Sequence, residues 1–239
     1  MKFTREGKTD FTEHYKRHKE VLQKHGCDVD ALIQLRQHFH KFPEGHFKEV
    51  KTQAKLLETL TSFGIKDIKK CAKTGLVADI HGTGKETAAG GIKCVAIRAD
   101  IDGLFMPENN HDLPYRTTTE YAHMCGHDGH MVMLLAAAQV LAKHTDKIPK
   151  GKTVRLLFQP AEESPGGALP MVKEGCLEGV DEVYGLHNFP NFDEGDIRVC
   201  DGGFFAGIIC VKITVKGQGG HGSSPHKIVD PIAAANQIY

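Results

Sequence analysis

The chain has 239 residues, and its 30 basic and 30 acidic side chains give a formal net charge of zero. Its composition, 40% hydrophobic and 25% charged, allows a substantial core and excludes a chain that is disordered by composition. No basic stripe with interleaved aromatic residues indicates a nucleic acid, and no window approaches the roughly 18 apolar residues of a membrane helix, so we expect neither partner. A charged N-terminus without a secretory segment and 7 cysteines without framework spacing indicate free thiols and a cytoplasmic location.

Helices alternate with strands along most of the chain. Hydrophobic periodicity, and the glycines and prolines that interrupt it, define these segments. The expected elements are helices over residues 28–42, 47–64, 130–144 and 167–177, and strands over 75–82, 94–103, 152–160 and 182–190. The first two strands, separated by one loop, are candidates for neighbours in a sheet. This alternation predicts an α/β layered fold with a mostly parallel sheet.

The pattern changes after residue 202. Residues 207–226 alternate between apolar and polar side chains, as a half-exposed antiparallel strand does. The alternating apolar residues are Ile209, Val211, Ile213 and Val215. We place a domain boundary near residues 202–207, so that residues 1–202 belong to a first domain and residues 203–239 begin a second. Because the chain stops partway into a helix that starts near Asp230, we expect a fragment or a truncated product of a longer protein.

Residues 120–130, EYAHMCGHDGH, bring together three histidines, a cysteine and an aspartate. Thiolate and imidazole groups are the donors that hold zinc-like metals, so this segment is a candidate metal site. Cys125 and His127 do not make a site by themselves, because at least three protein ligands must converge on the ion.

Further polar groups lie at or just past the C-terminal ends of the predicted strands. The segments are RADIDG (98–103), QPAEES (159–164) and LHNFP (186–190). In open α/β sheets the ligand crevice lies outside these strand ends, and the start of the helix that follows residue 126 projects into the same crevice. Side chains that are distant in the sequence can therefore converge there.

The residues expected to converge are Cys125, His127, one or both of Glu162 and Glu163, and His187. Adjacent side chains of an extended segment point in opposite directions, so one glutamate can bind a metal while the other acts as a general base toward metal-activated water. Each residue taken alone has an ordinary alternative: a solvated acidic turn, a buried histidine or a small core cysteine.

Several sequence blocks resemble, in order, the signature blocks of the M20 metallopeptidase family. They are LRQHFHKFPEGHFKEVKT, RADIDGL, HMCGHDGHMVMLL, FQPAEESPGGA, GLHNFP, and VKGQGGHGSSPH followed by DPI. They are most similar to the amidohydrolase branch of hippurate hydrolases, indole-acetyl-amino-acid hydrolases and N-acyl-amino-acid deacylases. The resemblance, from about residue 30 to residue 239, implies a phosphorylase/hydrolase-like zinc-peptidase catalytic domain, incomplete, over residues 1–202. It also implies the start of a small α+β lid and dimerisation domain over residues 203–239.

The resemblance also implies roles for single residues. The implied ligands of two divalent metal ions, zinc or manganese, are Cys125, His127, Glu163 and His187. Glu162 would be the general base, and Asp102, with Asp100 as the competing choice, would orient the site. His221 would stabilise the oxyanion of the reaction.

For the full-length form, the resemblance implies hydrolysis of the amide bond of N-acyl amino acids or related small peptides, and a homodimer through the lid domain. Members of the family continue beyond the lid strand, and a histidine near their C-terminus supplies a last metal ligand that has no counterpart before Tyr239. One alternative is therefore a non-catalytic, metal-binding remnant of such an enzyme. A structural zinc protein is a weaker alternative, because its closed shell of cysteines and histidines would not include carboxylates.

Overall fold

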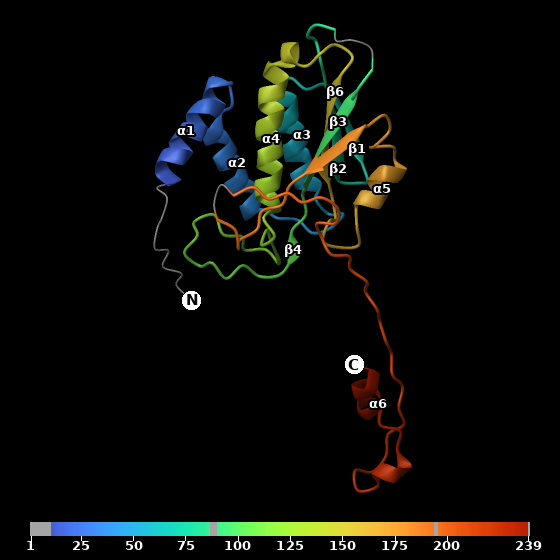
Figure 1. The fold of residues 1–239 in the computed structure, drawn as a ribbon. Helices are drawn as coiled ribbons and strands as arrows, with labels where there is room; N and C mark the ends of the chain where they lie inside the picture. Colours follow the sequence, from blue (N-terminus) through green and yellow to red (C-terminus); the bar gives the residue numbers. More distant parts are fainter. Residues whose placement is uncertain (1–10, 87–89, 194–195, 239) are drawn as a thin grey trace. The chain divides into compact units, whose positions relative to one another are not determined.

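The computed structural model describes residues 11–86, 90–193 and 196–238 of the chain (Figure 1). The chain divides into two compact units, residues 1–194 and residues 195–239. In the described ranges no helix combines the length and the apolar character that a bilayer span requires.

A five-stranded sheet forms the centre of the first unit. In spatial order its strands are β1 (Asp67–Cys71), β2 (Gly75–His81), β6 (Thr153–Gln159), β3 (Cys94–Asp100) and β7 (Glu182–Gly185). The strands β6, β3 and β7 are mutually parallel, whereas β2 is antiparallel to both β1 and β6. Only β2 therefore runs against the other strands, and the predicted α/β fold with a mostly parallel sheet is confirmed. A separate ribbon pairs β4 (Leu104–Phe105) with β5 (Tyr121–Ala122).

The expectation that strands 75–82 and 94–103 are neighbours is wrong. Strand β6 lies between β2 and β3 and pairs with both of them. The second half of β6, Leu156–Gln159, is buried without alternation, and a strand with this pattern is covered on both faces and sits inside a sheet. Adjacency in the sequence does not reveal such an insertion.

Helices cover both faces of this sheet. They are α1 (Phe11–Lys24), α2 (Val29–Lys41), α3 (Val50–Ser62), α4 (His127–Lys143) and α5 (Ala168–Lys173). The helices α2, α3 and α4 lie on one side of the sheet and α5 lies on the other (Figure 1). The four predicted helices and four predicted strands of this unit are present, although β7 ends at Gly185, before the predicted limit. Helix α1, the strands β1, β4 and β5, and a 3-10 turn (Thr145–Lys147) are additional to the expected elements.

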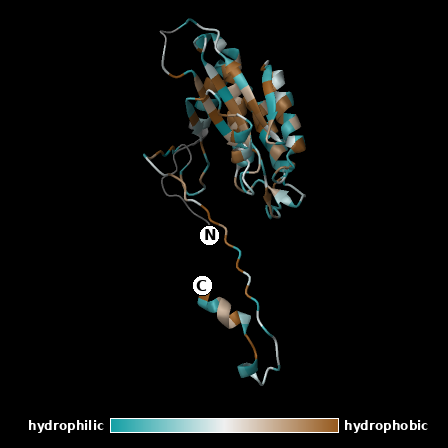
Figure 2. Cartoon of the chain, turned by 90° about the vertical axis from the view of Figure 1, so that its right-hand side faces the viewer, coloured by the Kyte–Doolittle hydropathy of each residue, from teal (hydrophilic) through white to brown (hydrophobic). Residues whose placement is uncertain are grey.

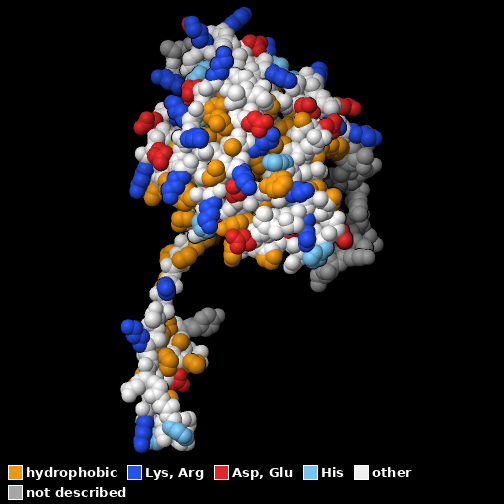
Figure 3. All heavy atoms as spheres, turned by 180° about the vertical axis from the view of Figure 1, so that it is seen from behind, with side chains coloured by type: hydrophobic (Ala, Val, Ile, Leu, Met, Phe, Trp, Pro, Cys, Tyr) orange, Lys and Arg blue, Asp and Glu red, His pale blue; other side chains and the backbone are white. Residues whose placement is uncertain are grey.

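Successive side chains of a strand point to opposite faces of the sheet, and a hydrophobic core lies on each face. Leu76 and Phe158 belong to the larger core, together with Leu56 of α3 and Leu135 of α4. The neighbouring residue Val77 faces the smaller core under α5. Figure 2 shows the corresponding hydrophobic segments in the strands and adjoining helices. Basic and acidic side chains are interspersed on the face of the first unit seen in Figure 3.

The second unit contains little regular structure. Its elements are a 3-10 turn (Pro225–Lys227) and helix α6 (Pro231–Ile238), with one isolated bridge between Gln218 and Val229. The predicted helix start near Asp230 is confirmed. The strand expected in residues 207–226 is wrong: the structure has no strand between residues 207 and 217, and Ile209 is 89% exposed. Alternating side chains make a strand only when another strand accepts its hydrogen bonds and another surface covers its apolar face.

Candidate metal centre

The first unit brings the predicted polar segments to one edge of the sheet. Strands β3 and β6 are parallel and in register, with Asp100 opposite Gln159, so the segments that follow them leave the sheet side by side. Helix α4 runs back along the sheet, and its first turn lies at this same end (Figure 1). Helix α4 begins at His127, three residues before the predicted start. The negative carboxylate of Asp128 in its first turn stabilises the helix by its interaction with the positive end of the helix dipole.

The five side chains that the sequence predicts to converge do so. Potential ligand atoms of Cys125, His127 and His187 lie within 4.8 Å of one another, and so do those of His127, Glu162 and Glu163. Cys125 Sγ is 3.4 Å from His187 Nε2, and His127 Nε2 is 3.7 Å from Glu163 Oε1. His127 is the residue that both groups share.

The chemistry of these donors fits a divalent cation. His127 Nε2 and Glu163 Oε1 are buried atoms without a hydrogen-bond partner. On its other side, His127 Nδ1 is 2.9 Å from the main-chain oxygen of Asp102. A carbonyl oxygen only accepts, so Nδ1 carries the proton and Nε2 of the neutral ring presents a lone pair. Buried polar atoms without partners are costly, and a cation between this lone pair and the carboxylate would satisfy both.

The protonation equilibria also reflect the crowding of acidic groups. Burial, followed by the charge of Glu163, raises the pKa of the Cys125 thiol to about 12. Burial and the same neighbouring charge raise the pKa of Glu162, whose side chain is 37% exposed. Burial by itself would lower the pKa of His127, but the hydrogen bond with Asp102 and the charge of Asp100 outweigh it and raise that pKa. Negative charge thus gathers around these groups, which favours the binding of a proton or a metal cation there.

The two aspartates of RADIDG have different partners. The carboxylate of Asp102 accepts hydrogen bonds from the main-chain N–H groups of Glu162 and Glu163, at 3.0 and 3.1 Å. Asp100 instead forms a 2.6 Å ion pair with Arg98 and a 2.6 Å hydrogen bond with His130 Nδ1. Although burial opposes it, the bond from His130 and nearby positive charges lower the pKa of Asp100 to about 2. Asp102 therefore holds the backbone of the two glutamates. Asp100 pairs with Arg98 and His130, and its Oδ2 also lies 3.6 Å from His127 Nε2. Asp100, His127 and His130 thus form a further group of potential metal ligands.

Further residues of the site were not predicted. The ring of His130 lies between Asp100 and Asn188, and its Nε2 is 2.5 Å from Asn188 Oδ1. Asn188 follows His187, so this contact anchors the segment that bears a candidate ligand. A signal was available for His130, because it lies three residues after His127 and shares its helix face.

Gly126 permits the close approach of this segment. Its φ of +91° is in the left-handed region, and a Cβ at this position would collide with the side chain of Asn188. Glycine therefore allows Cys125 and His127 to flank a sharp turn beside the segment that bears His187.

His221 lies in the second unit. Its side chain is exposed, its Nδ1 is 2.9 Å from Ser223 Oγ, and the Ser223 N–H donates to Nδ1 at 3.3 Å. Because Nδ1 accepts this bond, the proton of the neutral ring is on Nε2.

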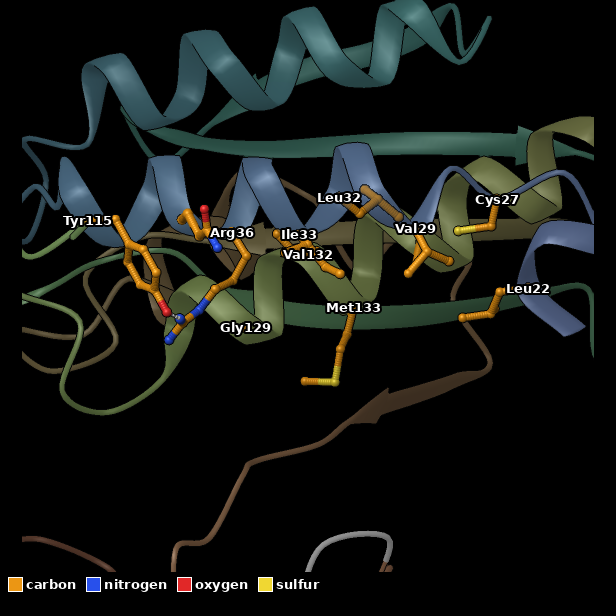
Figure 4. A pocket seen from close by; sticks show the side chains of 12 residues that line it. Leu22, Cys27, Val29, Leu32, Ile33, Arg36, Tyr115, Gly129, Val132 and Met133 are labelled. Atoms are coloured by element: carbon orange, nitrogen blue, oxygen red, sulfur yellow. Dashed lines mark hydrogen bonds between the residues drawn. The ribbon is translucent and has the colours of Figure 1, made fainter. Parts of the chain in front are cut away.

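A separate pocket of about 350 Å³ lies between α1, α2 and α4 (Figure 4). Its lining is mostly apolar, with Leu32 and Met133 among the side chains and Arg36 beside Tyr115 at one end. Its lining includes the thiol of Cys27 but no imidazole or carboxylate side chain, so the convergent metal-binding donors belong to the candidate metal centre.

The chain matches a known protein family. Residues 96–236 match the family model described as peptidase family M20/M25/M40. The chain belongs to this family.

The relatives of known sequence and structure are longer than this chain. The chain is 39% identical over 208 residues to N-acetyl-L-cysteine deacetylase of Bacillus subtilis, covering 87% of this chain and 48% of that protein. It is also 39% identical over 212 residues to thermostable carboxypeptidase 1 of Saccharolobus solfataricus, covering 87% and 52%. The solved structure of the Bacillus subtilis YXEP protein, a dinuclear metal-binding peptidase of the M20 family, matches with a TM-score of 0.61 and 35% identity, covering 68% of this chain and 44% of that one. The chain thus spans about half the length of the curated relatives that it matches.

Proposed function

We propose that this chain carries the catalytic residues of a metal-dependent amidohydrolase that cleaves the amide bond of N-acyl amino acids or related small peptides. The observation that carries the proposal is the pair of partnerless buried atoms, His127 Nε2 and Glu163 Oε1, beside a thiol and a second glutamate. The similarity to a deacetylase of an N-acetylated amino acid and to a carboxypeptidase supports this class of substrate.

The proposed ligands of two divalent cations, zinc or manganese, are Cys125, His127, Glu163 and His187. The similarity to a dinuclear M20 peptidase supports two ions. When bound, such ions lower the pKa of coordinated water and polarise a carbonyl group. Asp102 orients the centre through the main chain of both glutamates and through His127.

Glu162 is the proposed general base. Its carboxylate lies 3.9 Å from His127 Nε2, it is more exposed than Glu163, and its raised pKa makes it a better proton acceptor. Glu162 would take a proton from the attacking water and deliver it to the nitrogen of the departing amino acid. Because no hydrogen bond fixes its side chain to the ligands, it can make this transfer without releasing a metal ligand.

His221 is the proposed oxyanion donor, because the neutral ring carries its proton on Nε2 and can donate to a developing negative charge. Residues 1–202 are proposed to belong to the catalytic domain and residues 203–239 to begin the lid domain. A homodimer through that domain stays a prediction.

The test compares Glu162→Gln with Glu163→Gln in the 239-residue chain, with a panel of N-acetyl amino acids and metal analysis. We expect wild-type turnover that a chelator abolishes. Glu162→Gln should keep its metal and lose turnover by about 10²–10⁴-fold, the contribution of a positioned general base. Glu163→Gln should lose metal. A wild-type chain that binds metal without turnover would instead support the non-catalytic alternative.

A further inference from the structure

Three consecutive main-chain N–H groups at the glutamate pair donate to buried carboxylates. Those of Glu162 and Glu163 donate to Asp102, whereas that of Ala161 donates to Glu49 Oε1 at 2.9 Å. Glu49 lies 112 residues before Ala161 in the sequence and is 0% exposed. This carboxylate belongs to no group described above.

Glu49 is itself held from two sides. It occupies the residue before α3, and its Oε2 accepts a 2.5 Å hydrogen bond from the Thr74 hydroxyl. Thr74 lies in the turn between β1 and β2, and Gln53 of α3 binds the main-chain oxygens of Lys73 and Gly75 at 3.1 and 3.0 Å. The start of α3 and this turn therefore form a fixed frame around Glu49.

Ala161 needs such a frame because its backbone is in an unfavourable conformation. Its φ is +50°, in the left-handed region that non-glycine residues avoid, and it is fully buried. Its carbonyl accepts hydrogen bonds from Gly166 and Gly167, so Glu49 supplies the one contact that fixes the N–H side. Without an acceptor this buried N–H would favour another backbone conformation, and the direction of the next two residues would change with it.

The role differs from helix capping. The side chain of Glu49 makes no cap hydrogen bond to α3, although its residue stands at the N-cap position. Glu44 accepts bonds from both the N–H and the hydroxyl of Thr52 in the first turn of α3, at 2.8 and 3.0 Å. The two glutamates near the start of α3 thus have separate functions.

We propose that Glu49 is a positioning residue of the metal centre: through the N–H of Ala161 it sets the backbone that directs Glu162 and Glu163. The inference rests on the proposed function, since it assigns Glu49 a task toward the ligand and the base of that site. It deepens the assignment by extending the site to α3 and the turn between β1 and β2.

The experiment measures the zinc affinity of the full chain by competition with a chromophoric chelator, and the visible spectrum of the cobalt-loaded protein. Glu49→Asp keeps the charge but withdraws the carboxylate by one methylene, whereas Glu49→Gln keeps the length and an acceptor oxygen for Ala161. We expect Glu49→Asp to lower the affinity about tenfold or more and to change the cobalt spectrum, because residues that orient metal ligands have effects of this size. Glu49→Gln should restore an affinity within about threefold of wild type. Glu44→Ala is the matched control and should leave the spectrum unchanged.

The outcomes separate the two proposals. If zinc binding by the wild type does not depend on Cys125 and Glu163, the proposed function fails. If that dependence holds but Glu49→Asp has the affinity and spectrum of the wild type, only the role of Glu49 is wrong. A Glu49→Asp chain that does not fold would also overturn the positioning role of Glu49, because Glu49 would then serve the fold. A Glu49→Gln chain as impaired as Glu49→Asp would overturn it too, because Glu49 would then act through its charge.

Discussion

Replacing Asp102 by Asn should destabilise the first unit by removing one acceptor from the turn that bears the two glutamates. Both carboxylate oxygens of Asp102 accept main-chain N–H groups, from Glu162 at 3.0 Å and from Glu163 at 3.1 Å. Asn has the same shape, but its amide NH₂ must replace one of these oxygens and face an N–H donor. One hydrogen bond is lost, and the other loses its negative acceptor.

The structure sets the size of this effect. Asp102 is 1% exposed, so solvent water does not replace the lost acceptor. A hydrogen bond to a charged group contributes about 1.5–3 kcal/mol, and a neutral one contributes about 0.5–1.5 kcal/mol. We therefore expect Asp102→Asn to lower the free energy of unfolding by about 2–4 kcal/mol.

Urea denaturation, followed by circular dichroism, measures this difference. Asp181→Asn is the control, because a single oxygen of Asp181, Oδ2, accepts two consecutive main-chain N–H groups, from Lys93 and Cys94, and the residue is exposed. There the amide oxygen of Asn can keep both hydrogen bonds and water can reach the site, so the cost should stay near 1 kcal/mol or less. Equal losses in the two variants, or a loss below about 0.5 kcal/mol for Asp102→Asn, would refute the reasoning.

Other predictions concern the surroundings of the metal centre. Gly126→Ala should destabilise the protein by more than about 1 kcal/mol in the same assay, because its φ is +91° and its Cβ would meet Asn188; an unchanged midpoint would contradict this. Zinc at 100 times its dissociation constant should stabilise the protein by about 2.7 kcal/mol in thermal unfolding, and Cys125→Ser should remove most of this gain. The hydrogen bond with Asp128 outweighs burial and raises the pKa of His40 from 6.5. Since the folded state then holds the proton more tightly, the contribution of His40 is complete below about pH 6.5 and is lost as the pH rises through the raised value. The destabilisation by His40→Gln should accordingly be larger at pH 6 than at pH 9, and a cost independent of pH would exclude the mechanism.

Local patterns predicted much of the candidate site. Cys125 and His127 precede and open a strongly apolar helix, Glu162 and Glu163 follow a predicted strand, and His187 lies near the end of another. Because parallel strands end at one edge of a sheet, these positions sufficed to predict convergence without any coordinates. The same reasoning left the choice between Asp100 and Asp102 open, since both lie at the C-terminal end of one strand. Their hydrogen-bond partners distinguish the two residues in the folded chain.

Glu49 shows why the remaining part was not predictable. In the sequence it is one of several charged residues at the start of the expected helix 47–64, and such residues usually face solvent. Its burial follows from the packing of α3 against β2 and from the register that brings Gly75 and Thr74 close to the segment after β6. No periodicity of the chain encodes a contact between residues 112 positions apart.

The amino-acid sequence by itself determined four helices and four strands of the first unit, the α/β class, and the donors at the strand ends. These depend on local backbone preference and on the periodicity of apolar side chains. Tertiary structure alone decided that β6 enters between β2 and β3, that residues 207–217 form no strand, and that two buried carboxylates hold three successive amides at the glutamate pair. The physical reason is that pairing and burial belong to two segments at once: a strand needs its partner's hydrogen bonds, and a carboxylate needs donors that only the folded chain brings within hydrogen-bond distance.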